Sequence, residues 1–332
     1  MKREILCFGV REYEVATFIE LGKAYKYKLI LKEQLLTNDN IEEAFGSEII
    51  MIRGNCFLNR DSIETLNKKG LKYILTRTIG YNHLDIDACK DFGVKVAYAP
   101  GYSPNAISEL ALTLAMMLLR NVSYATNQTH NLDFRVTDQM HSKEVRNCTV
   151  GIIGCGRIGV TTAKYFSGLG ANVIGYDVFQ SSQAKQALKF ADLDTVLKES
   201  DIVSIHVTYI KGANDNLVDR EFISKMKDGA ILINTSRGEV HDLEALVEAV
   251  ESGKLNGVAL DVLKGENTLF NKKHEEITDP IHKRMMNLYP KFLITPHLGS
   301  STAEAVRGMV EISLKNMDDY LTSGTCRNSL TK

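Results

Sequence analysis

VGIIGCGRIG, residues 150–159, is the stretch of this sequence that determines the fold. Its first four residues form an apolar β-strand, and Gly154, Gly156 and Gly159 then make a GxGxxG turn into the helical pattern of residues 160–169. The glycines let the chain turn tightly and let its backbone approach a pyrophosphate, which the N–H groups at the start of the helix would bind. The stretch therefore predicts a dinucleotide-binding α/β domain.

An acidic residue follows at the distance that a dinucleotide site requires. Asp177 stands at the end of the next predicted strand, 18 residues after Gly159. A carboxylate at this position accepts hydrogen bonds from the adenosine ribose hydroxyls and disfavours a 2′-phosphate. We therefore expect NAD rather than NADP as the cofactor, with the three glycines and Asp177 among its contacts.

Short β-branched runs alternate with helical patterns on both sides of this stretch. Four strands are predicted before it, at Glu4–Gly9, Ile49–Ile52, Tyr73–Thr76 and Lys95–Tyr98. Six are predicted from it onward, at Cys148–Ile153, Asn172–Tyr176, Ile202–His206, Ala230–Asn234, Gly257–Ala259 and Phe292–Thr295. The alternation predicts an α/β protein with two parallel, doubly wound sheets.

Two long helices complete this outline. Pro104–Tyr124 is predicted as one helix between the two sheets, with Ser103 as its N-cap and Pro104 at its first position. Ala303–Leu321 is predicted to return to the first sheet and cover it. The first domain would then be discontinuous, made of residues 1–101 and 300–332, and the cofactor domain would occupy residues 102–299.

Composition excludes several classes of protein. The 332 residues carry 40 Lys+Arg against 41 Asp+Glu without a basic run, which disfavours nucleic acid as a partner. The most apolar stretch, Leu110–Leu119, is far shorter than the roughly 20 residues that span a bilayer, so we expect no membrane segment and a cytoplasmic protein. The six cysteines form no CxxC pair, so we expect neither structural zinc nor disulfides.

Three polar residues stand where predicted strands of the second sheet end: Arg237, Glu266 and His297. Ligands of doubly wound sheets bind at this edge. Reduction of a 2-oxo acid requires a guanidinium for the carboxylate and carbonyl, an imidazolium as proton donor, and a carboxylate that orients the imidazole and keeps it charged. These three side chains are therefore the candidate catalytic residues, although each of them taken alone is better explained by a structural or surface role.

The chain resembles the D-2-hydroxyacid dehydrogenases over nearly its whole length. GCGRIG at 154, NTSRGEVHD at 234, ALDVLKGE at 259 and TPHLGSST at 295 match that family's motifs in order and spacing. The resemblance implies that Arg237 binds the substrate carboxylate and carbonyl, that His297 is the acid/base and that Glu266 is its partner. It also implies a cofactor domain inserted into a smaller, flavodoxin-like substrate domain, and a homodimer formed through the cofactor domain and its preceding helix. Further cofactor contacts implied by the resemblance are Arg157, Ile158, Val207, Thr208, Thr235, Ser236 and, on the nicotinamide amide, Asp261.

Within that family the chain is most similar to the D-lactate, D-2-hydroxyisocaproate and (R)-2-hydroxyglutarate dehydrogenases, through YILTRTIGYNHLD at 73 and GYSPNAISELAL at 101. The resemblance places Tyr102 beside the substrate. Arg53 and Asn55 replace an uncharged stretch of the lactate-type enzymes, and Ser301 replaces an aromatic residue. RGNCF at 53 and SKEVRNCTVG at 142 resemble the (R)-2-hydroxyglutarate dehydrogenases of amino-acid-fermenting anaerobes.

We therefore predict 2-oxoglutarate as the substrate, with Arg53 on its second carboxylate. An internal salt bridge is the alternative role for Arg53. A D-lactate or D-2-hydroxyisocaproate dehydrogenase is the alternative enzyme, because the same three catalytic residues would serve it. An NADH-sensing corepressor is the alternative outside enzymes, although the chain has no disordered or charged tail with which to recruit partners.

Overall fold

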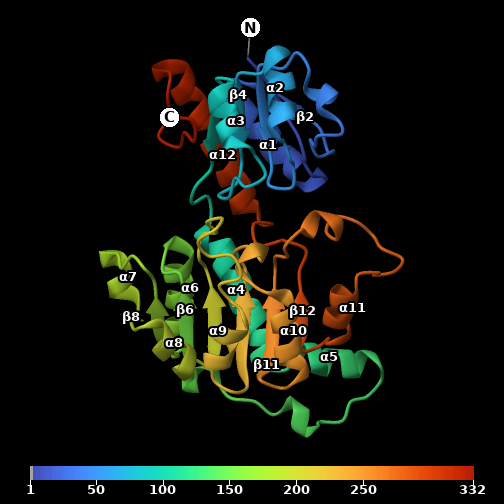
Figure 1. Ribbon diagram of the computed structural model, residues 1–332, viewed down its shortest axis with the longest axis vertical. Helices are drawn as coiled ribbons and strands as arrows, with labels where there is room; N and C mark the ends of the chain where they lie inside the picture. The colour runs from blue at the N-terminus through green and yellow to red at the C-terminus, as the bar shows by residue number, and fades with distance from the viewer. Residues whose placement is uncertain (1–2) are drawn as a thin grey trace. The chain divides into compact units, whose positions relative to one another are not determined.

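The chain folds into two compact units. The computed structural model describes residues 3–332. One unit comprises the chain up to Ser103 together with Ser301–Lys332, and the other comprises Pro104–Ser300 (Figure 1). Each unit is built around its own parallel sheet, so the predicted fold class is confirmed.

The first unit has a five-stranded sheet in the order β2-β1-β3-β4-β5, which is the flavodoxin-like order. All of its strand pairs are parallel. Its strands are β1 (Glu4–Cys7), β2 (Lys28–Leu31), β3 (Ile49–Ile52), β4 (Tyr73–Thr76) and β5 (Lys95–Tyr98). Its α-helices are α1 (Val15–Ala24), α2 (Arg60–Lys68), α3 (Ile86–Asp91) and α12 (Ala303–Ser323).

Helices cover both faces of this first sheet. One buried cluster joins α1 and α12 to the sheet, and it includes Phe18, Leu314 and Met317. A second cluster lies on the opposite face under α2 and α3, and it includes Ile63 and Ala88. The C-terminal helix thus packs on the first sheet as predicted.

The second unit has a seven-stranded parallel sheet in the order β12-β11-β10-β9-β6-β7-β8. Its strands are β6 (Thr149–Ile153), β7 (Asn172–Tyr176), β8 (Lys189–Phe190), β9 (Ile202–Ile205), β10 (Ala230–Asn234), β11 (Leu255–Leu260) and β12 (Phe292–Ile294). The strand order reverses between β6 and β9, so a ligand site is expected beyond the carboxyl ends of these strands.

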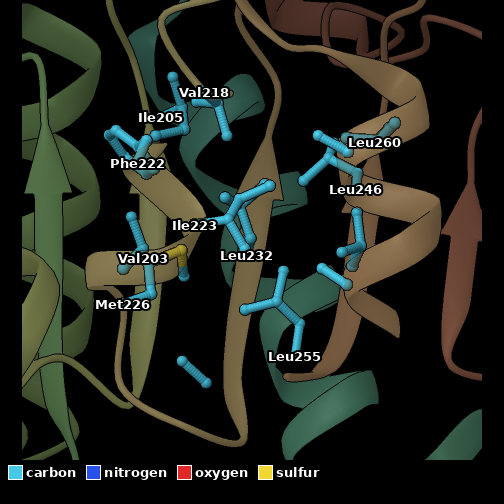
Figure 2. Packing of buried hydrophobic residues seen from close by; sticks show 14 of the residues in the cluster. Val203, Ile205, Val218, Phe222, Ile223, Met226, Leu232, Leu246, Leu255 and Leu260 are labelled. Carbon is cyan, nitrogen blue, oxygen red and sulfur yellow. The ribbon is translucent and has the colours of Figure 1, made fainter. Parts of the chain in front are cut away.

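Two hydrophobic clusters hold the helices of the second unit on its sheet. Its helices are α4 (Pro104–Leu119), α5 (Val122–His130), α6 (Arg157–Gly168), α7 (Ser182–Ala187), α8 (Leu193–Glu199), α9 (Arg220–Lys225), α10 (Leu243–Glu251) and α11 (Pro280–Asn287). On one face α4 and α6 pack together over the strands. On the other face, Phe222 and Ile223 of α9 and Leu246 of α10 meet Val203 and Leu232 of the sheet (Figure 2).

The prediction of one continuous helix from Pro104 to Tyr124 is wrong. The helix ends at Leu119, and α5 begins at Val122 after a 66° bend. Asn121 between them has a φ of 51°, in the left-handed region that asparagine tolerates better than most residues. The two polar residues at the break, Arg120 and Asn121, are flanked by Leu119 and Val122, and so short a polar interruption also occurs within amphipathic helices, which is why hydrophobic periodicity did not reveal the break.

Two short strands at sheet edges were not predicted. β2 lies at the edge of the first sheet and is partly exposed, and β8 has two residues at the edge of the second. Edge strands need no continuous apolar run, so their sequences carry a weak signal.

Within residues 3–332 no single helix is long and apolar enough to cross a membrane, and only the bent pair of α4 and α5 reaches that length and composition together.

Candidate active site

The glycine turn between β6 and α6 is shaped by close backbone contacts. Gly154 has a φ of +92°, and a Cβ there would lie 2.7 Å from the carbonyl carbon of His206. A Cβ on Gly159 would lie 2.0 Å from the carbonyl oxygen of Gly154. Both positions therefore require glycine, because a side chain would push the turn away from the helix and from β9.

Gly156 differs from the other two glycines because no other part of the protein lies close to the position that a Cβ would occupy. A Cβ there would meet nothing within 4 Å, and the residue is the N-cap of α6, where it supplies no side-chain acceptor for the first N–H groups of the helix. Thr235, at the end of β10, has a buried hydroxyl oxygen without a hydrogen-bond partner among the described residues. An open backbone at a helix start and an unsatisfied buried hydroxyl fit a bound dinucleotide.

Asp177 lies beside this turn, immediately after β7. Its Oδ2 accepts a hydrogen bond of 2.6 Å from the backbone N–H of Cys155, and its Oδ1 accepts one of 2.9 Å from that of Phe179. A carboxylate has about four acceptor positions, so capacity remains for ribose hydroxyls. Burial, followed by the charge of Asp177, raises the pKa of the Cys155 thiol to about 12, so the thiol beside this carboxylate is protonated.

The remaining sequence-predicted cofactor residues follow the ends of strands β6, β9, β10 and β11 or begin α6. Arg157 and Thr208 are exposed, whereas Ile158, Val207 and Ser236 are half-buried. They lie at the carboxyl ends of the strands or at the start of α6, on the side of the sheet where a ligand is expected because the strand order reverses between β6 and β9. Asp261, by contrast, is buried at the end of β11.

Asp261 organises the segment that follows β12. Its carboxylate accepts hydrogen bonds from the Thr295 hydroxyl (2.6 Å) and from the backbone N–H groups of Leu298 and Gly299 (both 2.9 Å). Burial raises the pKa of Asp261, and the charge of His297 together with these donors opposes that rise. The residue thus anchors the loop that carries His297.

Glu266 and His297 form a hydrogen-bonded carboxylate–imidazole pair in the second unit. His297 Nδ1 lies 2.5 Å from Glu266 Oε1. Glu266 Oε2 also accepts the backbone N–H of Leu263 at 3.2 Å, which fixes the orientation of the carboxylate. Because an ionised carboxylate only accepts hydrogen bonds, Nδ1 carries a proton toward Glu266, and Nε2 is the nitrogen left for proton transfer.

The backbone of His297 is in an unusual conformation. Its φ is 53°, a value that few non-glycine residues adopt, and its N–H donates to the Thr295 carbonyl at 2.9 Å. The hydrogen bonds of Asp261 on either side of this residue hold the turn in place. Strain of this kind is common where a side chain must be aimed at a substrate.

Arg237 follows β10 and is half-buried. Its Nη1 donates to the Ser236 carbonyl at 2.7 Å, and within residues 3–332 the guanidinium forms no ion pair. A Cβ on the next residue, Gly238, would lie 2.0 Å from the carbonyl carbon of Leu263. Gly238 therefore permits the loop of Arg237 to pack against the loop of Glu266, and the cation remains available for an anionic ligand.

Arg53 follows β3 in the first unit, where a turn places it next to Gly54 and Asn55. Its aliphatic stem lies over Gly9, at which a Cβ would be 2.6 Å from Arg53 Cδ. Burial, followed by the charges of Arg77 and Arg11, lowers the pKa of Arg53 to about 10. In the described part of the chain its guanidinium has no carboxylate partner, so the internal salt bridge considered from the sequence is not formed.

The nearest carboxylate is already engaged. Glu14 accepts two hydrogen bonds from Arg77, at 2.8 and 3.0 Å, and one from the backbone N–H of Arg11 at 2.8 Å. Glu14 and Arg77 are both 2% exposed. Burial by itself would raise the pKa of Glu14, but the hydrogen bonds and charge of Arg77 hold that pKa below its ordinary value. Sequence reasoning missed this pair, which joins residues 63 positions apart and has no local signal.

The other predicted substrate residues also belong to the first unit. Asn55 and Tyr102 are half-buried, and Ser301 is exposed just before Thr302, the N-cap of α12. A Cβ on Gly308 of α12 would lie 2.7 Å from the carbonyl oxygen of Tyr102, so this glycine permits the loop after β5 to approach the helix. Within residues 3–332 no cluster of His, Cys, Asp and Glu could hold a metal ion.

Comparison with known proteins agrees with this geometry. Residues 112–299 match the family described as D-isomer specific 2-hydroxyacid dehydrogenase, NAD binding domain. The chain is 39% identical over 328 residues to an aromatic 2-oxoacid reductase of Clostridium sporogenes, covering 98% of each chain. It is 36% identical to a D-2-hydroxyacid dehydrogenase (NAD(+)) of Clostridioides difficile, covering 98% of this chain and 99% of the relative. A solved D-2-hydroxyisocaproate dehydrogenase superposes with a TM-score of 0.88 at 31% identity, over 99% of this chain and 100% of that one.

Proposed function

This chain belongs to the D-isomer-specific 2-hydroxyacid dehydrogenase family, and from that premise we propose that it reduces 2-oxoglutarate to (R)-2-hydroxyglutarate. It is an NAD-dependent oxidoreductase that acts on a small 2-oxo or 2-hydroxy acid. We assign the contacts to the distal part of the substrate to the first unit, and we assign cofactor binding and the catalytic residues to the second. The 2-oxoglutarate assignment depends above all on Arg53, a half-buried cation beside two further arginines that forms no ion pair with a carboxylate of the described residues.

The catalytic roles follow from the hydrogen bonds of the second unit. Arg237 would bind the carboxylate next to the carbonyl and polarise that carbonyl, because its guanidinium forms no ion pair with any of residues 3–332. His297 would donate the proton at Nε2 to the forming alkoxide, since Nδ1 is held by Glu266. Bound NADH supplies the hydride. Glu266 would orient the imidazole and stabilise its charged form before transfer.

The cofactor site would use the open backbone at Gly156 and the start of α6 for the phosphates, and Asp177 for the adenosine ribose. Thr235 would place its unpartnered hydroxyl toward the same cofactor. Arg157, Ile158, Val207, Thr208 and Ser236 would complete the contacts along this edge, with Asp261 near the nicotinamide amide.

Charge balance supports a dicarboxylate. Arg11, Arg53 and Arg77 place three cations near one another in the first unit, and Glu14, the carboxylate whose charge acts on Arg53, is bound to Arg77. A partly desolvated cation without a partner is unfavourable until an anion pairs with it. The distal carboxylate of 2-oxoglutarate would supply that anion, with Asn55, Tyr102 and Ser301 as further substrate contacts.

An aromatic 2-oxo acid is the second candidate. The Clostridium sporogenes relative is named an aromatic 2-oxoacid reductase. The rings of Tyr81, which follows β4, and Tyr98, the last residue of β5, lie 5.9 Å apart in an edge-to-face arrangement. An aromatic pair at this edge could pack against an apolar side chain. This candidate leaves the charge of Arg53 without a role, so we favour the dicarboxylate.

A substrate panel tests the proposal. Initial rates with NADH should be measured on 2-oxoglutarate, phenylpyruvate, pyruvate and 2-oxoisocaproate, and chiral chromatography should identify the product. We expect the highest kcat/KM on 2-oxoglutarate and a product of R configuration. A higher kcat/KM on phenylpyruvate would transfer the assignment to the aromatic acids, and absence of NADH oxidation with every acid would contradict an enzymatic role.

Asp177 provides a test of cofactor preference. The wild-type enzyme should prefer NADH over NADPH, because this carboxylate would repel a 2′-phosphate. Asp177→Ala should narrow the preference by about 10- to 100-fold, mainly through weaker NADH binding, since hydrogen bonds to a charged group are worth about 1.5–3 kcal/mol. Fluorescence titration with both cofactors measures this, and Asp177→Asn is a second variant that removes the charge but keeps one acceptor oxygen for either Cys155 or Phe179. Equal affinities of wild type for NADH and NADPH would contradict the role of Asp177.

We propose that the protein is a homodimer formed through α4, α5 and the segment after them. Leu112, Met116 and Met117 of α4 border a surface hollow with Val122 of α5. In the following segment Leu132, Phe134 and Val136 are 83%, 74% and 89% exposed. Apolar surface of this kind is typical of a protein interface.

Light scattering of the purified protein tests this interface. We expect a mass of twice the 37.0 kDa of one chain. Phe134→Asp combined with Val136→Asp should shift the protein toward monomer, because two charges would have to be buried at the interface. A wild-type monomer at micromolar concentration would rule out the proposed dimer, and an unshifted variant would exclude this segment from it.

A further inference from the structure

The loop that carries Arg237 is organised by one buried side chain, that of Asn234 at the end of β10. Its Oδ1 accepts the backbone N–H (2.8 Å) and the hydroxyl (2.7 Å) of Ser236. Its Nδ2 donates to the carbonyl of Arg237 (3.0 Å) and lies 2.8 Å from Nδ1 of His241. All four hydrogen-bonding positions of the amide are used, so Asn234 specifies the path of the loop.

These partners also determine the protonation state of His241. The Ser236 N–H can only donate and the Arg237 carbonyl can only accept, so the orientation of the Asn234 amide is settled by its backbone contacts. Nδ1 of His241 must therefore accept a hydrogen bond from Nδ2, and the ring proton is on Nε2. Burial lowers the pKa of His241 to about 4, which agrees with a neutral ring.

The Nε2–H of His241 has no partner among the described residues, although the residue is 3% exposed. A buried donor without an acceptor is unfavourable. An apolar side chain would fill this space without burying an unsatisfied donor. The interaction that His241 adds is the hydrogen bond that its Nδ1 accepts from Asn234.

We propose that His241 is a positioning residue for substrate binding, which acts through Asn234 on the backbone of Ser236 and Arg237. This inference depends on the proposed role of Arg237 in binding the substrate carboxylate. His241 acts only as a neutral acceptor, and its proton is not transferred. Because Gly238 presses the same loop against Leu263, three residues before Glu266, a shift of the loop would also disturb the distance between Arg237 and the Glu266 loop.

Two substitutions separate this role from simple space filling. His241→Val removes the acceptor and also the unpartnered Nε2–H, leaving one N–H of Asn234 without a partner, so the number of unsatisfied donors is unchanged. His241→Asn places an amide oxygen close to the position of Nδ1 and can restore the acceptor. A positioning role predicts that the two variants differ in substrate binding, whereas a space-filling role predicts that they do not.

The test measures KM and kcat for 2-oxoglutarate and pyruvate, the NADH dissociation constant by fluorescence, and the melting temperature of each variant. We expect His241→Val to raise KM for both acids by roughly tenfold, because a small displacement of a positioning group is costly. The NADH dissociation constant should rise by a smaller factor than KM, because Ser236 is only one of several proposed cofactor contacts, and His241→Asn should recover most of the lost affinity.

Double variants with Asn234→Ala complete the experiment. If His241 acts through Asn234, adding His241→Val to Asn234→Ala should raise KM no further. An unchanged KM in His241→Val would overturn the proposal, as would equal losses in His241→Val and His241→Asn or a parallel loss of NADH binding. If the wild type oxidised NADH with neither acid, the proposed function would have failed instead, so the two failures are distinguishable.

Discussion

His297→Gln is expected to lower kcat for reduction of the 2-oxo acid by about 10²- to 10⁴-fold, the usual contribution of a positioned proton donor. The amide retains a polar side chain of similar length but has no transferable proton. NADH affinity should change little, because the cofactor site uses the glycine turn and Asp177 rather than the imidazole. Steady-state rates and NADH fluorescence titration measure the two quantities separately.

Glu266 supplies the matched control for this prediction. Glu266→Gln keeps an acceptor within reach of His297 Nδ1 but removes the negative charge, so kcat should fall less than in His297→Gln. The double variant should be no slower than His297→Gln alone, because Glu266 acts through His297 and residues that act as one unit are not additive. A double variant that loses the product of both single effects would assign Glu266 an independent role.

Arg53→Met is expected to raise KM for 2-oxoglutarate by about 30-fold to several thousand-fold. Removing one partner of a desolvated, hydrogen-bonded charge pair costs about 2–5 kcal/mol, and each 1.4 kcal/mol is a factor of ten. Pyruvate has no distal charge, so its KM should change much less. 2-Oxoisocaproate should improve, because its apolar tail would no longer meet an unpaired cation. Competing initial rates on the three acids measure this change of preference.

Two controls limit the interpretation of the Arg53 result. Arg60→Met removes an exposed arginine of the same unit, paired with Asp91 at the surface, and should leave the preference unchanged. Arg237→Met should impair all 2-oxo acids together, since it would bind the carboxylate that they share. A loss of the same factor on pyruvate and 2-oxoglutarate in Arg53→Met, with an unchanged melting temperature, would remove the main support for the dicarboxylate.

Local sequence was sufficient for the parts of the fold that depend on neighbouring residues. The strand, turn and helix around Gly154–Gly159 were predictable because the motif lies within six residues, and a Cβ on Gly159 would strike the carbonyl oxygen of Gly154 in the same turn. The central strands were predictable for a similar reason, since a strand buried on both faces must be a continuous apolar run. The edge strands β2 and β8 are free of that requirement, and they were missed.

Only the tertiary structure decided which polar groups have partners. The residue types Arg237, Glu266 and His297 were evident as candidates, but the 2.5 Å contact between Glu266 and His297 depends on two loops that are separated by 31 positions in the chain. The engagement of Glu14 by Arg77, which leaves Arg53 unpaired, depends on a contact across 63 positions. The acceptor role of His241 likewise depends on the orientation of a buried amide. Hydrogen bonds and ion pairs of this kind form only between atoms a few ångströms apart in the folded chain. The separation of two residues along the sequence does not give the distance between their side chains.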